Sequence, residues 1–142
     1  MLAGADDARV AALSGYGLPL GEAFQLRDDV LGVFGDPEQT GKPAGDDLRE
    51  GKRTMLVAVA RQNSTPQQEA TLRRHLGDPR LSAAKIDQLR QVIVDTGALE
   101  HVEELIAALV DQAQTALAAA PVDEATREVL ADLVGAATAR QT

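Results

Sequence analysis

The stretch between positions 21 and 54 decides how this chain is interpreted, and it reads GEAFQLRDDVLGVFGDPEQTGKPAGDDLREGKRT. Two adjacent carboxylates, Asp28 and Asp29, lie in an apolar segment and are followed by Gly41-Lys42 and Gly51-Lys52. Mg²⁺ takes oxygen ligands and is usually held by one or two carboxylates together with substrate phosphates. Lysine adds a mobile point charge for the remaining phosphate oxygens. The stretch therefore predicts part of a site for magnesium and a diphosphate.

The apolar pattern around the aspartate pair predicts a helix from Leu18 to Phe34. Its apolar positions lie on more than one face, as expected of a helix inside a bundle; they are Leu20, Phe24, Leu26, Val30, Leu31 and Val33. Gly35-Asp36-Pro37 ends this helix, because glycine suits a left-handed cap and proline cannot continue it. We expect a polar loop from Asp36 to Gly45 and a short turn from Asp46 to Glu50.

The rest of the chain predicts further helices. Thr65 before Pro66, and Ser82, are residues of the types that cap helix N-termini. No alternating strand pattern, internal repeat or long linker interrupts the series. The expected ranges are Thr54 to Arg61, Thr65 to Gly77, Ser82 to Gly97, Ala98 to Ala120 and Asp123 to Arg140. The prediction is an all-α fold, a helical bundle of about six helices that forms one domain over residues 1–142.

Composition narrows the class of protein. The chain has 142 residues, a formal net charge of −8 and no cysteine, with 44% hydrophobic and 25% charged residues. This balance is typical of a globular protein, and the acidic charge argues against nucleic-acid binding. No signal-peptide pattern opens the chain and no apolar run is long enough to span a membrane. The absence of cysteine excludes a disulfide framework, and we expect a cytoplasmic location.

Three polar side chains of the first helix share a face. Gln25, Asp28 and Asp29 stand at helical positions i, i+3 and i+4, one turn apart. Paired aspartates on a helix are usually a solvated surface patch. Here the surrounding residues are apolar, so both charges are expected beside a core, where like charges are costly unless a cation intervenes. The pair is therefore a candidate metal site.

The constellation resembles the second aspartate-rich region of the trans-polyprenyl diphosphate synthases. The motifs that carry the resemblance are Phe24-Gln25 before the aspartate pair, Gly35-Asp36, Gly41-Lys42, an aspartate at 46 or 47, and Gly51-Lys52-Arg53-Thr54. The stretch from Ala23 to Thr54 is most similar to bacterial synthases of the geranylgeranyl type. The remaining chain resembles the helical C-terminal part of the same family. The resemblance implies the C-terminal part of an isoprenoid synthase fold.

The resemblance also implies roles for the polar residues. Asp28 is implied as a direct ligand of a Mg²⁺ that bridges to the allylic diphosphate, and Asp29 as its support through coordinated water. Lys42 and Lys52 are implied to hold that diphosphate. For Lys42 the neighbouring residues agree, because Gly41 lets the backbone approach a phosphate and Pro43 restrains the loop.

Further roles concern the prenyl chain and the turn after the loop. Gln25 is implied to lie near the allylic carbon or its bridging oxygen, and Phe24 to wall the prenyl-chain cavity. Asp46 or Asp47 caps the next turn or orients Lys52, and the sequence does not separate these two roles.

The sequence also departs from the family pattern. The second motif usually has a third aspartate one turn after the pair, where this chain has Gly32. The family's first aspartate-rich motif, and most of its isopentenyl diphosphate site, have no counterpart in the 142 residues. The implied activity is that of a prenyltransferase that condenses an allylic prenyl diphosphate with isopentenyl diphosphate, with Mg²⁺ as cofactor. We expect the chain alone to be inactive.

Assembly with another chain is expected for the same reason. The first helix would leave Leu20, Phe24 and Leu31 without a neighbour, so a second copy or an N-terminal half of a synthase is the expected partner. The alternative function is a non-catalytic helical interaction or oligomerisation protein with a relict diphosphate site. Terpene cyclases are less similar, because their second motif is built around Asn, Ser or Thr and Glu. Product chain length stays open.

Overall fold

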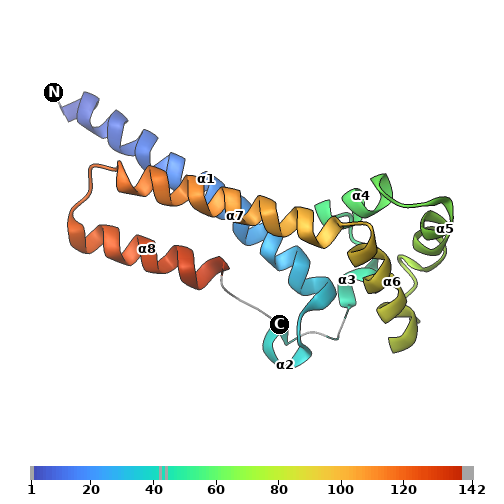
Figure 1. Cartoon of the computed structure of the whole chain (residues 1–142). Coiled ribbons are helices and arrows are strands. Elements are labelled where there is room, and N and C mark those ends of the chain that lie inside the picture. Colours follow the sequence, from blue (N-terminus) through green and yellow to red (C-terminus); the bar gives the residue numbers. More distant parts are fainter. Residues whose placement is uncertain (1, 42, 44, 139–142) are drawn as a thin grey trace. The chain divides into compact units, whose positions relative to one another are not determined.

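The computed structural model describes residues 2–41, 43 and 45–138, and these residues form helices joined by short loops, with no strand among them (Figure 1). The all-α prediction is confirmed. The helical segments are α1 (Leu2–Phe34), α2 (Pro37–Thr40), α3 (Asp46–Glu50), α4 (Met55–Gln62), α5 (Pro66–His75), α6 (Ala83–Asp95), α7 (Ala98–Ala118) and α8 (Glu124–Thr138). None of the described helices is long and apolar enough to cross a membrane.

Two predictions near the N-terminus were wrong. Helix α1 begins at Leu2 instead of Leu18 and continues through Pro19. Proline removes one backbone donor from a helix, and buried Tyr16 and Leu20 on either side hold the helix through this position. The expected loop after Gly35 contains the single-turn helix α2, because Asp36 accepts a hydrogen bond from the backbone N–H of Glu38 at 3.0 Å and Pro37 suits the first helical turn.

The predicted caps of the later helices are present. The Thr65 hydroxyl accepts from the backbone N–H of Gln68, and the Gln68 side chain accepts from the backbone N–H of Thr65, which completes a capping box. The Ser82 and Thr54 hydroxyls cap α6 and α4 by accepting from the backbone N–H groups of Lys85 and Val57, at 3.2 Å each. The predicted end of the last helix at Arg140 lies outside the described residues.

The described residues divide into two compact units. One contains residues 2–27 and 105–138, and the other contains the described residues from 28 to 104. The sequence indicated one domain. Each unit is described by itself below.

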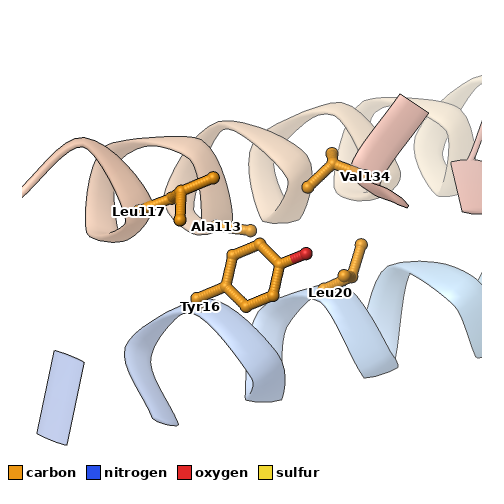
Figure 2. Close-up of a cluster of buried hydrophobic side chains, with 5 residues drawn as sticks. All are labelled: Tyr16, Leu20, Ala113, Leu117 and Val134. Carbon is orange, nitrogen blue, oxygen red and sulfur yellow. The ribbon is translucent and has the colours of Figure 1, made fainter. Parts of the chain in front are cut away.

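The core of the first unit joins three helices. Figure 2 shows the Tyr16 ring of α1 among its apolar neighbours, and the cluster consists of Tyr16, Leu20, Ala113, Leu117 and Val134. The Tyr16 hydroxyl donates a hydrogen bond to the carbonyl oxygen of Leu130 at 2.7 Å, and burial raises the pKa of Tyr16. Leu20 is buried in this cluster, so the prediction that it lacks a neighbour was wrong.

Arg127 fastens the turn between α7 and α8. Its guanidinium donates to the carbonyl oxygen of Ala120 at 2.8 Å and pairs with Glu124 at 3.3 Å. The Asp123 carboxylate accepts from the backbone N–H of Thr126 at 2.7 Å and caps α8. Carbonyls at the end of one helix and amides at the start of the next are thus both satisfied.

The second unit is built around fully buried aliphatic side chains: Val33, Leu48, Leu56, Leu72, Ile86, Leu89 and Ile93. Leu31 is also buried here, so it does not lack a neighbour as predicted. Gly51 has φ +67°, and a Cβ there would stand 2.9 Å from the Cα of Gly77. The Gly77 N–H donates to the carbonyl oxygen of Leu48 at 2.9 Å. These contacts fix α3 against the turn before α6.

Candidate functional site

The aspartate pair lies near the C-terminal end of α1, within the second unit. Asp29 is buried, with 7% of its surface exposed, whereas Asp28 is half-buried. The prediction that the pair lies beside a core is therefore confirmed for Asp29. A buried carboxylate needs a charged or hydrogen-bonding partner, and for Asp29 the partner comes from the loop between α3 and α4.

Lys52 provides that partner. Its Nζ atom lies 3.5 Å from Oδ1 of Asp29 and 3.8 Å from Oδ2 of Asp47, while its side chain stays 41% exposed. The nearby carboxylates, Asp47 first and then Asp29, raise the pKa of Lys52 against the opposing effect of burial. The side chain is thus a protonated ammonium that reaches both the buried carboxylates and solvent.

The backbone of α3 explains why Lys52 lies there. Gly51 caps α3 in the left-handed conformation, and the Lys52 N–H donates to the carbonyl oxygen of Asp47 at 3.1 Å. The chain therefore turns back at Gly51 and returns the residue after it to the same end of α3. The glycine before Lys52, noted in the sequence, has this structural role.

Asp47 rather than Asp46 is the aspartate that contacts Lys52. The N-cap of α3 is Gly45, and no side chain caps this helix. Asp47 is buried, Asp46 is half-buried, and the ion pair of 3.8 Å joins Lys52 to Asp47. Of the two roles left open by the sequence, the geometry matches orientation of Lys52.

A contact between Gly32 and Asp47 was missed by sequence reasoning. A Cβ atom built at Gly32 would overlap the Asp47 carboxylate, with Oδ2 as the nearest atom. The available signal was the glycine at the position where the resembled motif has an aspartate. It marks the point where the carboxylate of α3 lies directly against α1.

The remaining predicted residues lie elsewhere. Phe24, 43% exposed, and exposed Gln25 precede the aspartates on α1 and belong to the first unit. Lys42 lies outside the described residues. Arg53 is exposed.

The donor set that the structure brings together is chemically suited to a hard cation. Asp29 and Asp47 meet at the ammonium of Lys52, and half-buried Asp28 precedes Asp29 on α1. Among the described side chains, no three His, Cys, Asp or Glu residues are grouped for metal binding. Mg²⁺ commonly combines one or two carboxylates with phosphate oxygens and waters, and this arrangement fits such shared coordination.

Comparison with known proteins identifies the family. Residues 1–93 match the model of the polyprenyl synthetase family. The chain is 40% identical over 115 residues to a geranylfarnesyl diphosphate synthase of Aeropyrum pernix, covering 80% of this chain and 35% of that protein. It is 38% identical over 121 residues to a geranylgeranyl diphosphate synthase of Mycobacterium tuberculosis, covering 85% of this chain and 34% of the relative.

Solved structures give the same result. A geranylgeranyl pyrophosphate synthase of Corynebacterium glutamicum, in complex with isoprenyl diphosphate and magnesium, superimposes with a TM-score of 0.88 at 42% identity. That match covers 93% of this chain and 38% of the other. The chain thus spans a little over a third of the relatives it matches. With two thirds of its length inside the family model and relatives above 30% identity, the chain belongs to the polyprenyl synthetase family.

Proposed function

We propose that this chain supplies the second aspartate-rich half of the active site of a polyprenyl diphosphate synthase of the geranylgeranyl type. The reaction is the condensation of an allylic prenyl diphosphate with isopentenyl diphosphate. Because the chain spans only about a third of its relatives, the remaining half of the site has to come from residues outside it, and the chain alone is expected to be inactive.

The observation that carries the proposal is the convergence of Asp29 and Lys52. A buried carboxylate of α1 and a half-exposed ammonium of the α3–α4 loop meet at 3.5 Å, beside Asp28 on the same helix. Under the proposal, an oxygen ligand and a phosphate-binding cation are next to each other. A surface patch of charge does not require a buried aspartate at its centre.

We propose roles for the chain's own residues from this geometry and from the resemblance. Asp28, the more exposed member of the pair, would bind the Mg²⁺, and Asp29 would hold Lys52 and orient coordinated water. Lys52 and Lys42 would bind the diphosphate oxygens. Gln25 would lie near the reacting end of the allylic substrate, and Phe24 would line the prenyl-chain cavity.

In the proposed reaction the leaving group is the diphosphate, which carries negative charge. Mg²⁺, when bound, neutralises charge on the departing diphosphate. The ammonium of Lys52, fixed by Asp29 and Asp47, adds a preorganised positive charge at the same place, which costs little reorganisation during the reaction. Asp29 itself is buried, so its carboxylate has little contact with bulk water.

A calorimetric titration tests the proposal. A non-hydrolysable prenyl diphosphate analogue is titrated into the chain with and without Mg²⁺, for wild type and for the variants Asp28→Ala and Lys52→Gln. Asp132→Ala, an exposed aspartate of α8, is the matched control. We expect metal-dependent binding that is lost in Asp28→Ala, weakened in Lys52→Gln and unchanged in the control. A folded wild-type chain that does not bind supports the alternative, a helical assembly protein with a relict site.

A second proposal concerns the partner. Large apolar side chains of α1 and α8 in the first unit are exposed: Val10, Leu13, Leu18, Val129 and Leu133. Exposed apolar residues of this number are typical of an interaction surface. We propose that a second copy of the chain covers them. A sharp monomer peak in light scattering at high protein concentration, unchanged by Leu18→Ser, would count against self-association.

A further inference from the structure

We infer that Gly32 and Asp47 form a matched pair that positions Lys52. The absence of a side chain at Gly32 admits the Asp47 carboxylate onto α1, and this carboxylate holds the ammonium of Lys52. The functional meaning of the inference, that Lys52 is held ready for a diphosphate, rests on the proposed function. The pairing itself rests on the contacts within the second unit.

The space between Gly32 and Asp47 leaves no room for a side chain at position 32. A Cβ at Gly32 would overlap the Asp47 carboxylate, and Oδ2 is the atom it would meet first. The same Oδ2 is the atom that lies 3.8 Å from Nζ of Lys52. Any side chain at position 32 therefore displaces the oxygen that faces the ammonium.

Contacts on both sides of Asp47 keep α3 from moving away to make room. Leu48, the next residue, is fully buried, and its carbonyl oxygen accepts a hydrogen bond from Gly77 at 2.9 Å. The close approach of Gly51 to Gly77 fixes the other end of α3. The Asp47 side chain must therefore rotate, and its rotation separates it from Lys52.

The opposite charges of Asp47 and Lys52 also hold the two side chains together. Asp47 is buried, so its carboxylate and the ammonium of Lys52 stabilise each other. In the resembled motif a third aspartate stands where this chain has Gly32. Here a carboxylate from α3 lies against that bare position of α1, and it shares the ammonium of Lys52 with Asp29.

Urea denaturation of the 142-residue chain tests the pairing. Gly32→Ala is expected to lower the urea midpoint. Gly21→Ala is the matched control, because Gly21 is in the same helix and a Cβ there meets nothing within 4 Å; it should leave the midpoint unchanged or raise it slightly. In an Asp47→Ala background Gly32→Ala should lose its effect, whereas in an Asp47→Asn background, which keeps the shape, the effect should persist.

The positioning of Lys52 is tested by a second cycle. Lys52→Gln should lower the midpoint in the wild-type chain and do so less in the Gly32→Ala chain. The same pair of variants is then compared for Mg²⁺-dependent binding of inorganic pyrophosphate. Lys52→Gln should weaken binding by about tenfold in the wild type, and by a clearly smaller factor when Gly32→Ala is present.

The outcomes separate the two proposals. If wild-type protein does not bind pyrophosphate, the proposed function fails, and the urea cycles still decide the Gly32–Asp47 pairing. The inference is overturned if Gly32→Ala lowers the midpoint equally in the Asp47→Ala background. It is also overturned if the Lys52→Gln change in midpoint is the same with and without Gly32→Ala.

Discussion

The Nε atom of Arg90 lies 2.7 Å from the carbonyl oxygen of Val33, so a side chain of α6 caps the end of the helix that carries the aspartate pair. The last carbonyls of a helix have no partner within it, and a cation at this end also complements the helix dipole. Arg90 is itself held by Asp87 at 3.1 Å. The orientation of the end of α1 thus depends on a residue more than fifty positions away.

Loss of this cap is expected to destabilise the second unit. Arg90→Met keeps much of the side chain's length and removes the donor, and should lower the free energy of unfolding by about 1–3 kcal/mol, since a charged hydrogen bond is lost and a carbonyl is left without its partner. Urea denaturation measures the change. Asp87→Ala removes only an exposed ion-pair partner and should cost less than about 1 kcal/mol; equal losses in the two variants would contradict the capping role.

Gly51→Ala is expected to be more damaging than Gly97→Ala, a substitution at another left-handed glycine. Gly51 has a left-handed conformation and almost touches the backbone of Gly77. The left-handed conformation alone costs about 1–2 kcal/mol for a residue with a Cβ, and the contact with Gly77 adds to this. Gly97→Ala is the control, because φ is +81° there and nothing lies within 4 Å of the added Cβ. Thermal denaturation should show a larger loss for Gly51→Ala, and equal losses would mean that the contact is unimportant.

The single tyrosine reports on the first unit. Burial raises the pKa of Tyr16 above its ordinary value of 10.0, and the chain contains one Tyr and no Trp. Ultraviolet titration should therefore show phenolate formation at a higher pH in the native chain than in urea. Because the native state keeps its proton longer, this stability contribution is complete below about pH 10 and is lost as the pH rises through the native pKa.

A companion variant separates burial from the hydrogen bond of Tyr16. Tyr16→Phe keeps the ring and removes the donor to the Leu130 carbonyl, and should cost about 1–2 kcal/mol. Leu117→Ala in the same cluster should cost more, about 2–5 kcal/mol. A Tyr16→Phe variant as stable as the wild type would show that water replaces the hydroxyl as donor.

The cap of α8 predicts an effect at acid pH. Hydrogen bonds from Thr126 lower the pKa of Asp123 below its ordinary value of 3.8. The unfolded state therefore takes up the proton first as the pH falls, so the stabilisation is present above about pH 4 and is lost as the pH falls through the lowered pKa. Asp123→Asn retains a cap of suitable type without a titrating group. Helicity measured by circular dichroism between pH 5 and 2 should fall more for the wild type than for Asp123→Asn.

The sequence correctly predicted the helix boundaries that are determined by neighbouring residues. Thr65, Ser82 and the glycine before α7 bound helices where expected, because caps and left-handed turns depend on a few neighbouring residues. The family followed from the ordered motifs between 21 and 54. The extension of α1 before Pro19 was missed, because burial of Tyr16 and Leu20 against α7 and α8 outweighs one missing hydrogen bond.

In the site, too, the sequence predicted the local features and missed the contacts between helices. The sequence indicated that Asp28, Asp29 and Lys52 belong together, and the structure places Lys52 beside Asp29. The sequence did not distinguish Asp46 from Asp47 as the partner of Lys52, because the distinction depends on which face of α3 packs against α1. The contact of Gly32 with Asp47 joins two helices, and its signal in the sequence is the glycine at the position where the resembled motif has an aspartate. The ligand roles of Asp28, Gln25 and Lys42 stay predictions.

The hydrogen bond from Gly77 to Leu48 closes a loop through α4 and α5 onto α3. The position of Lys52 therefore depends on contacts between residues distant in sequence. A synthetic peptide that spans 21–54 contains each motif but lacks Gly77, Leu72 and Ile86, and therefore cannot reproduce the geometry. The motif lies within thirty-four consecutive residues. Its folding nevertheless requires the whole second unit.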